Sequence, residues 1–404
     1  MDKLIMVLPA TYWQIPLVNK IKEMGYKTLS VNLYENSPAF EYSDYHEVAN
    51  ILDKEKCLEI AQKYNIDAIL SDECDIAMPT VAYIAEKLGL PSLGNRCASL
   101  YTNKLLMREF CTKHKLPSVN YRLCKTEEEA ESFYKDLGCD IILKPLDSNS
   151  SHGVFRITSQ EQIREKFSES LSFSKVEKAV LAERFVDGTE FTVDGLNTPE
   201  GHLTLAISEK KHFTHNVNIA NELFFSHYNS QYDYNKLREL NNRFVELSNL
   251  PIGIFTHAEY KYQDGEFFLI EIGARGGGNL ISAVIVPLMS GVDNYKYLIN
   301  ASLGEKTESP FINEAYKDRC SVLYFFSTPN GGGKVAKIEG LDFLDCNSHI
   351  VKYAFNFKVG DVIKNAVSDS ARIGYYIAYT NSKNELELLM NEINERVKII
   401  YENE

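Results

Sequence analysis

One stretch, residues 255–279, constrains the fold of this chain more than any other segment. Two runs rich in β-branched and aromatic residues flank Asp264 and Gly265, a dipeptide typical of two-residue hairpin turns. Counting outward from that turn places Glu259 and Glu271 across or near each other on an antiparallel strand pair. The sequence therefore predicts a β-hairpin that carries two neighbouring carboxylates.

These two carboxylates suit a divalent cation. Glu271 lies in an otherwise apolar run, 267–272, where an unpaired carboxylate would be costly, so we expect a metal or another cation beside it. Two acids so placed can bridge Mg²⁺ ions that also grip ATP phosphates. The alternative is that Glu271 only pairs with Arg275 or Lys261.

Arg275 heads a segment of three consecutive glycines. Because glycines allow a close approach of the backbone, a guanidinium at this place could neutralise a bound carboxylate or a developing oxyanion. An ordinary surface turn is the alternative interpretation. The chemistry of this segment therefore depends on what lies around it in the fold.

The order of elements divides the chain into regions. At 404 residues and 44% hydrophobic content, the chain is long enough for two or three packed domains. Residues 1–95 indicate an open α/β domain, because the apolar run 4–9, an amphipathic stretch and a second strand-like run at 27–33 give a βαβ opening. No GxGxxG follows the first run, which disfavours a dinucleotide fold. From residue 101, a helix-like segment precedes strands rich in β-branched residues.

A phosphate-covering loop is expected after the strand that ends in Lys144. The loop, 148–153, consists of small and polar residues, among them Ser150, Ser151 and Gly153. Small residues let backbone N–H groups close around phosphate oxygens, while the lysine adds a fixed positive charge. An ordinary Ser/Asn hairpin beside a lysine is the alternative.

A nucleoside-binding hinge is expected some thirty residues later. Two carboxylates, Glu183 and Glu190, flank a strand, a glycine-containing turn and the start of a second strand. A hinge strand offers backbone donors and acceptors to an adenine edge, and an acid just past the turn can accept both ribose hydroxyls. Taken alone, the same pattern could be a surface hairpin with solvated acids.

Composition excludes several classes of partner. The formal net charge of -13 disfavours a nucleic acid or an anionic membrane, since both need a concentrated basic face. The eight cysteines are scattered without a CxxC pair, which indicates reduced thiols rather than a zinc site or a disulfide framework. The apolar run near the N-terminus is too short for a signal or a spanning helix, so a cytoplasmic location is expected.

In this order, the strand ending in Lys144, the Ser/Gly loop, the ExxxxGxE pattern over 183–190 and the paired acids Glu259 and Glu271 resemble the ATP-grasp superfamily. The resemblance implies an α/β and α+β multidomain fold. It comprises an N-terminal open parallel-sheet domain, an ATP-grasp domain and a small C-terminal β-rich lid domain. The implied boundaries are 1–95, 96–305 and 306–404. In the last region we expect short strands and a final helix over 384–401.

The resemblance also implies a role for individual residues. Those assigned to ATP are Lys104, Lys144, Ser150, Ser151, Gly153, Glu183, Phe185, Val186 and Glu190. The lysines would contact the α- and β-phosphates, Glu183 and the backbone of the hinge would hold adenine, and Glu190 would hold ribose. Glu259 and Glu271 would bind Mg²⁺, for which Mn²⁺ could substitute. Gly273 stands where the family often has Asn, so one metal ligand is expected to be missing or supplied by water.

The run from Glu271 to Arg275, with His257 two residues before the first acid, looks most like the carboxylate-amine ligase branch that includes the L-amino acid (dipeptide-forming) ligases. This resemblance implies an enzyme that forms an amide through an acyl phosphate and releases ADP and phosphate. Its substrates would be a small carboxylate and an amine, with amino acids expected. Arg275 would bind the carboxylate and its acyl phosphate, and His257 would be a base, an oxyanion donor or a packed imidazole.

Other functions remain open at this point. The same parts could serve a carboxylase that phosphorylates bicarbonate, a small-molecule kinase or a regulator that binds ATP without turnover. The stretch 208–222 should line the acceptor pocket, although it lacks the proline-containing pattern of the family. A homodimer is an expectation by resemblance only.

Overall fold

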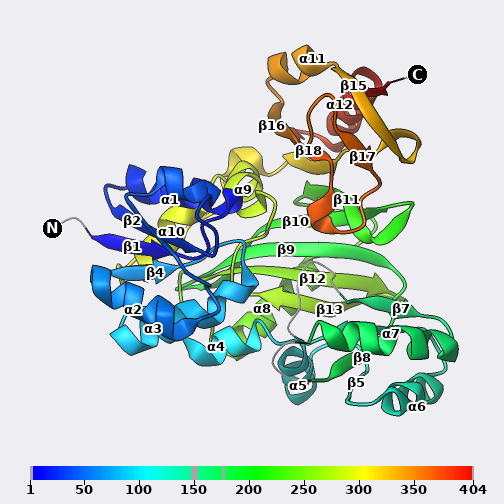
Figure 1. Ribbon diagram of the computed structural model, residues 1–404, viewed down its shortest axis with the longest axis horizontal. Helices are drawn as coiled ribbons and strands as arrows, with labels where there is room; N and C mark the ends of the chain where they lie inside the picture. Colours follow the sequence, from blue (N-terminus) through cyan, green and yellow to red (C-terminus); the bar gives the residue numbers. More distant parts are fainter. Residues whose placement is uncertain (1–2, 147–152, 175–177, 403–404) are drawn as a thin grey trace.

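The computed structural model describes residues 3–146, 153–174 and 178–402 (Figure 1). The predicted fold class is confirmed. The structure contains an N-terminal parallel sheet, two central antiparallel sheets and a small C-terminal antiparallel sheet.

The N-terminal region is an open parallel sheet of order β3-β2-β1-β4. Its strands are β1 (Leu4–Val7), β2 (Lys27–Asn32), β3 (Tyr45–Val48) and β4 (Ala68–Leu70). The accompanying helices are α1 (Ile15–Glu23), α2 (Lys54–Tyr64), α3 (Met78–Leu88) and α4 (Gly94–Leu100), with the 3-10 turns η1 (Tyr12–Gln14), η2 (Pro38–Tyr42) and η3 (Asp75–Ala77). Three successive residues of β1, Ile5 to Val7, have no exposed surface, as expected for a strand covered on both faces. The loop after β4 therefore lies at the edge where the carboxyl ends of the parallel strands meet.

A four-stranded sheet of order β5-β8-β6-β7 follows. Its strands are β5 (Tyr121–Cys124), β6 (Ile141–Pro145), β7 (Phe155–Ile157) and β8 (Val180–Arg184). The helices α6 (Glu127–Leu137) and α7 (Gln160–Ser172) pack against it, and α5 (Lys104–His114) leads into it. In the pairing of β6 with β8, Ile142 lies opposite Glu183. Lys144, two residues further along β6, therefore lies on the same face as Glu183.

The central sheet has eight strands in the order β13-β12-β9-β10-β11-β14-β18-β16. Their bounds are β9 (Thr189–Thr198), β10 (Gly201–Phe213), β11 (Asn216–Ser226), β12 (Phe255–Gln263), β13 (Glu266–Gly273), β14 (Cys320–Phe325), β16 (Ile350–Phe355) and β18 (Gly374–Thr380). The helix α8 (Tyr234–Ser248) packs on β9 and β10, while α9 (Val286–Ser290) packs on β10 and β14. Strands from the C-terminal hundred residues thus extend the sheet that carries the predicted metal acids.

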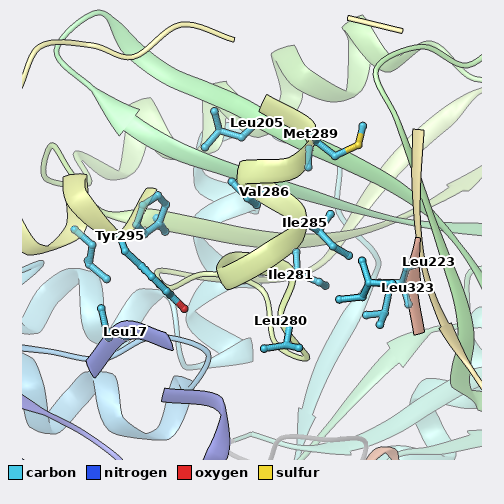
Figure 2. Packing of buried hydrophobic residues seen from close by; sticks show 14 of the residues in the cluster. Leu17, Leu205, Leu223, Leu280, Ile281, Ile285, Val286, Met289, Tyr295 and Leu323 are labelled. Carbon is cyan, nitrogen blue, oxygen red and sulfur yellow. The ribbon is translucent and has the colours of Figure 1, made fainter. Parts of the chain in front are cut away.

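A helical turn anchors one face of this sheet. The π-helical turn η4 (Ile281–Ile285) and α9 place their apolar side chains among those of the strands (Figure 2). Leu280, Ile281 and Ile285 lie in one buried cluster with Leu223 and Leu323. The chain segment that follows the triple glycine is therefore held by the core. The helix α10 (Asn294–Ser302) then runs beside β4 of the N-terminal region.

The C-terminal region adds a three-stranded sheet of order β17-β15-β19. Its elements are β15 (Gly332–Glu339), β17 (Val362–Lys364), β19 (Lys398–Tyr401), α11 (Leu341–Cys346), α12 (Lys383–Arg396) and the 3-10 turns η5 (Glu314–Tyr316), η6 (Pro329–Gly331) and η7 (Asp369–Ala371). The expectation of one helix over 384–401 is wrong, because α12 ends at Arg396 and β19 pairs with β15. Lys398 to Tyr401 is a β-branched and aromatic run whose alternate residues Ile399 and Tyr401 are buried, a pattern that fits a pleated strand.

Candidate active site

The predicted hairpin is formed by β12 and β13. Glu259 and Glu271 are direct partners in its register, so the expectation of neighbouring carboxylates is confirmed. Asp264 and Gly265 form the turn with φ of 52° and 86°, the positive values that a tight two-residue hairpin requires. The two acids keep 30% and 35% of their side-chain surface exposed, which leaves room for a ligand.

Glu271 has a cationic partner from a distant segment. Lys104, the first residue of α5, places its Nζ 2.9 Å from Glu271 Oε1. Of the cations weighed from the sequence, neither Arg275 nor Lys261 forms an ion pair with Glu271 in the described part of the chain. Burial lowers the pKa of Lys104, but the Glu271 carboxylate outweighs it and the net shift is upward. Lys104 is thus a buried cation aimed at the predicted metal acids.

A lysine that the sequence did not single out connects acids on two neighbouring strands, β9 and β12. Lys210 on β10 places Nζ 2.8 Å from Glu190 Oε1 and 2.6 Å from Glu259 Oε1. Burial raises the pKa of both carboxyls, but the Lys210 charge reverses this and holds each below its usual range. His212 lies 3.4 Å from the second oxygen of Glu190. Position 210 lies in the stretch expected to line an acceptor pocket. The positive charge of this lysine was the only sequence feature that could have pointed to its contact with the acids.

The second predicted phosphate lysine is held by a buried acid. Lys144 Nζ lies 2.7 Å from Glu183 Oε2, and the Nε of the fully buried Arg108 lies 2.8 Å from Glu183 Oε1. Burial lowers the pKa of Lys144 to about 8; Glu183 opposes the shift, while Arg108 and Lys104 add to it. Burial raises the pKa of Glu183, but the two cations bring the net shift below its usual value. Arg108 was missed because the sequence gives no sign that an arginine on α5 turns inward.

The expected adenine hinge is the connection between β8 and β9. The Glu183 side chain contacts Lys144 and Arg108, whereas Val186 is buried at 2% exposure in the connection itself. The Phe185 ring lies 3.9 Å from the Arg156 guanidinium carbon. These positions place the backbone of 185–187 between the four-stranded sheet and the central sheet.

The expected phosphate loop is only partly described. Ser150 and Ser151 lie outside the described residues. Gly153 is described, buried, and has a φ of +75°. A Cβ at Gly153 would lie 2.7 Å from the Phe173 ring, so the backbone approaches that ring closely.

His257 has a defined partner on one side and an acid on the other. Its Nδ1 lies 2.8 Å from Asp194 Oδ1, and its Nε2 lies 3.8 Å from Glu259 Oε1. Burial lowers the pKa of His257, but Asp194 outweighs it and raises the pKa to about 9. Asp194 is opposite His257 in the register of β9 and β12, so the strand pairing itself fixes this contact. The Asp194 side chain is buried and was not anticipated from the sequence.

Arg275 is held by an acid of the N-terminal region. Its Nε donates to Asp75 Oδ1 at 2.9 Å, its Nη2 donates to Asp75 Oδ2, and its Nη1 donates to the Gly276 carbonyl at 2.9 Å. Burial lowers the pKa of Arg275, but Asp75 reverses the shift and raises it. The Gly276 N–H donates to Asp72 Oδ1 at 2.7 Å. Asp72 and Asp75 follow β4 and were not predicted, because only the fold brings residues two hundred positions apart together.

The donor set of the hairpin fits a hard divalent cation in part. Glu259 and Glu271 offer carboxylate oxygens, the ligand type that Mg²⁺ prefers. Among the described residues, no group of three or more His, Cys, Asp or Glu side chains is placed to hold a metal ion. Two carboxylates suffice only if phosphate oxygens and water complete the shell, which is how Mg²⁺ is usually held beside nucleotides.

Two families of known domains match the chain. The ATP-grasp domain matches residues 137–283, which include the hinge and both hairpin acids, and the L-amino acid ligase C-terminal domain 2 matches residues 325–402. The chain thus carries an ATP-grasp domain followed by an L-amino acid ligase C-terminal domain. The predicted resemblance is thereby confirmed, including the branch with an L-amino acid ligase C-terminal domain. An ATP-grasp domain implies that the chain binds ATP.

The chain is also similar to individual proteins, over all or part of its length. The chain is similar to an L-amino acid ligase from Bacillus licheniformis, with a TM-score of 0.82, 20% identity and coverage of 100% of this chain and 99% of that structure. It is 24% identical to dapdiamide A synthase of Enterobacter agglomerans over 93% of this chain and 92% of that protein. A formate-dependent phosphoribosylglycinamide formyltransferase of Sulfolobus acidocaldarius is 29% identical over 42% of this chain and 43% of its own length. The chain thus spans less than half of that relative. No helix in the described residues is long and apolar enough to cross a membrane.

Proposed function

We propose that this chain is an ATP-dependent carboxylate-amine ligase that joins two amino acids, or an amino acid and a related amine, through an acyl phosphate. The observation that carries the proposal is the combination of an ATP-grasp domain with an L-amino acid ligase C-terminal domain in one chain. The similarity to dapdiamide A synthase over nearly the whole length of both chains supports it. The eight free cysteines support a reducing compartment, and we propose the cytoplasm.

We assign nucleotide binding to residues of the two antiparallel sheets and of α5. The backbone of Phe185 and Val186 would meet adenine, Glu190 would accept the ribose hydroxyls, and Lys104 and Lys144 would neutralise phosphate oxygens. The Glu183 carboxylate would hold Lys144 in position for the phosphates, because it lies 2.7 Å from Lys144 Nζ. The small residues of the loop ending at Gly153 would cover the phosphates. The proposed unit runs from residue 96 to residue 305, after an N-terminal domain over 1–95 and before a lid over 306–404.

Glu259 and Glu271 would hold Mg²⁺. When bound, this ion neutralises phosphate charge and orients the γ-phosphoryl group. Lys210 ties Glu259 to Glu190 at 2.6 and 2.8 Å, so the proposed metal acid and the proposed ribose acid are fixed relative to each other. Lys104 contacts Glu271 and would shift toward phosphate oxygens as they arrive, since both are anionic partners for one buried cation.

Arg275 would bind the carboxylate substrate. A guanidinium matches a carboxylate with two parallel hydrogen bonds and stays charged at every relevant pH. A carboxylate oxygen attacks the γ-phosphorus, ADP leaves, and the acyl phosphate keeps its negative charge beside the buried cations. The amine then attacks the carbonyl carbon, phosphate leaves with the former carboxylate oxygen, and the amine loses a proton. His257, held by Asp194 at 2.8 Å, would act as an oxyanion donor in this step.

The direct test is release of ADP and phosphate from Mg-ATP by the purified full chain, with amino acids supplied singly and in all pairs. We expect release that requires two amino acids, and a condensed product one water lighter than their sum by mass spectrometry. Glu271→Gln, which keeps the size of the side chain, should give no product and serves as the background control.

The other functions give different results in the same assay. Release that depends on bicarbonate alone would favour a carboxylase, and a stable phosphorylated product without an amine would favour a kinase. Binding of ATP without release under any of these conditions would contradict a ligase that joins two amino acids and would favour a regulator.

A further inference from the structure

The loop that follows β4 of the N-terminal region, residues 71–75, contacts the Arg-Gly segment 275–280. Asp72 accepts the Gly276 N–H at 2.7 Å, Glu73 Oε2 accepts the Leu280 N–H at 3.4 Å, and Asp75 pairs with Arg275. Three carboxylates from one loop thus contact three positions of one segment. Contacts at three positions fix where the segment lies relative to the loop. The acids also attract the positive charge of Arg275.

Asp75 grips one edge of the guanidinium. Its two oxygens accept from Nε and Nη2, while Nη1 donates to the Gly276 carbonyl at 2.9 Å. A guanidinium carries five N–H donors in a rigid fork, and three are used here, so Nη1 and Nη2 each keep one hydrogen for a further carboxylate. Because side-by-side pairing with one acid fixes the plane of the fork, it also fixes where that second edge points.

The glycines of this segment leave the space that the acids occupy. A Cβ at Gly273 would lie 2.5 Å from Asp75 Oδ1, whereas a Cβ at Gly276 would lie 2.1 Å from Ser282 Oγ and 2.6 Å from Asp72 Oδ1. At these distances a real Cβ atom would force the neighbouring carboxylate to shift. Gly273 is two residues beyond Glu271 on β13, so Asp75 lies on the strand face that carries the hairpin acids. The asparagine expected at position 273 from the resemblance would therefore collide with Asp75.

We propose that Asp75 is a positioning residue for Arg275, and that it fills the space that a side chain at position 273 would take. This inference rests on the proposed function, since it assigns Arg275 to the carboxylate substrate. The N-terminal domain thereby supplies part of the carboxylate site, and Gly273 is the change on β13 that makes room for it. Asp75 acts through Arg275 and does not itself touch the reacting atoms.

The test uses a matched set of variants of the full chain. Asp75→Asn keeps the size of the side chain but removes its charge, and Gly273→Ala displaces Asp75 by adding a Cβ. Asp53→Asn is the control, because Asp53 caps α2 on the same domain through Lys56 N–H, and asparagine caps a helix equally well. The carboxylate substrate is the amino acid that gives the highest ADP release with wild-type protein.

Asp75→Asn should raise the KM for that amino acid by about tenfold to a hundredfold, because a binding group that is slightly misplaced loses that much. The KM for ATP should change by about twofold or less. The Asp75→Asn/Gly273→Ala double variant should be no worse than the poorer single variant, because both changes remove one contact. Asp53→Asn should match wild type. Equal losses for ATP and the amino acid, or additive effects, would overturn the proposal.

Hydrogen exchange of residues 271–282 provides a readout that does not need turnover. Asp75→Asn should speed exchange in this segment and leave β12 unchanged, whereas unchanged exchange in the segment would overturn the positioning role. If wild-type protein shows no amino-acid-dependent turnover, the proposed function fails. The exchange result then still decides whether Asp75 holds Arg275.

Discussion

One face of the central sheet has two halves of opposite character. Glu190 and Lys210 are register partners on β9 and β10, and the same row continues through Leu223 on β11, Leu323 on β14 and Ile377 on β18. The first two are a buried ion pair, while the last three are buried in the apolar cluster that η4 and α9 cover. A single step from β10 to β11 changes the row from charged to apolar.

This difference teaches how the sheet combines a rigid frame with a charged site. In the charged half, Lys210 pairs with both Glu190 and Glu259, because an unpaired charge with little contact to water would be costly. In the apolar half, packing alone stabilises the strands. Changes in the first half should therefore alter catalysis, and changes in the second half should alter stability.

Glu271→Gln should have the largest effect. The variant removes one of the two proposed metal acids, so turnover should fall by about a thousandfold or more, as expected when a group that stabilises transferring phosphoryl charge is lost. The fold should stay intact, because glutamine keeps the size of the side chain and its carbonyl oxygen can still accept from Lys104 Nζ. Glu266→Gln, at the far end of the same strand, should keep wild-type turnover. Full activity of Glu271→Gln in the ADP assay would refute its metal role.

Leu323→Ala tests the apolar half. Leu323 has no exposed surface, and truncating such a leucine should lower the free energy of unfolding by about 3 kcal/mol. Urea unfolding followed by circular dichroism measures this change, with Leu388→Ala on the exposed face of α12 as the control. Turnover per folded molecule should stay near wild type. A stable Leu323→Ala protein with poor turnover would erase the division between the two halves.

Asp194→Asn tests the partner of His257 and should have a smaller effect on turnover. Asparagine keeps a polar group near His257 Nδ1 but loses the charge that orients the ring, so kcat should fall by about tenfold to a hundredfold. Steady-state kinetics at saturating ATP measure the loss. Asp233→Asn is the control, because Asp233 only caps α8. A kcat equal to wild type would show that His257 is simply packed.

The pH dependence of ATP affinity should show the smallest effect. Burial lowers the pKa of Lys144 to about 8, so its charge is present below that pH and is lost as the pH rises through it. ATP should bind about tenfold more weakly at pH 9 than at pH 7, since the competent fraction falls by that factor. Titration calorimetry measures this change. Lys144→Arg stays charged and should bind ATP with a flat profile; a flat wild-type profile would contradict the assignment.

Local patterns were sufficient for the hairpin and for the order of the domains. Counting from the turn residues Asp264 and Gly265 pairs Glu259 with Ile270, so it could place the two acids near each other. A β-bulge between Glu259 and Tyr260 shifts the register and brings Glu259 directly opposite Glu271, which counting could not find. The same reasoning mistook the last strand, Lys398–Tyr401, for helix, because a short apolar run after a helix carries no clear stop signal.

The partners of the site residues could not be found in this way. Arg108, Lys210, Asp194 and Asp75 reach the site from four different elements, and each contacts a predicted residue that lies 20 to 200 positions away in sequence. Periodicity predicts which face of an element is buried, but it does not tell which buried charges meet. The roles assigned to Glu183 and Arg275 stay predictions, and their observed contacts with Lys144 and Asp75 say how they would be held.

The most direct test of the central claim is the fate of a carboxylate oxygen. The amino acid that supports turnover would be labelled with ¹⁸O in its carboxylate and incubated with Mg-ATP, the amine substrate and the full chain. We expect one ¹⁸O atom in each released phosphate by mass spectrometry, because the acyl phosphate leaves its bridging oxygen on phosphorus. Phosphate without label, formed together with ADP, would contradict activation of the carboxylate.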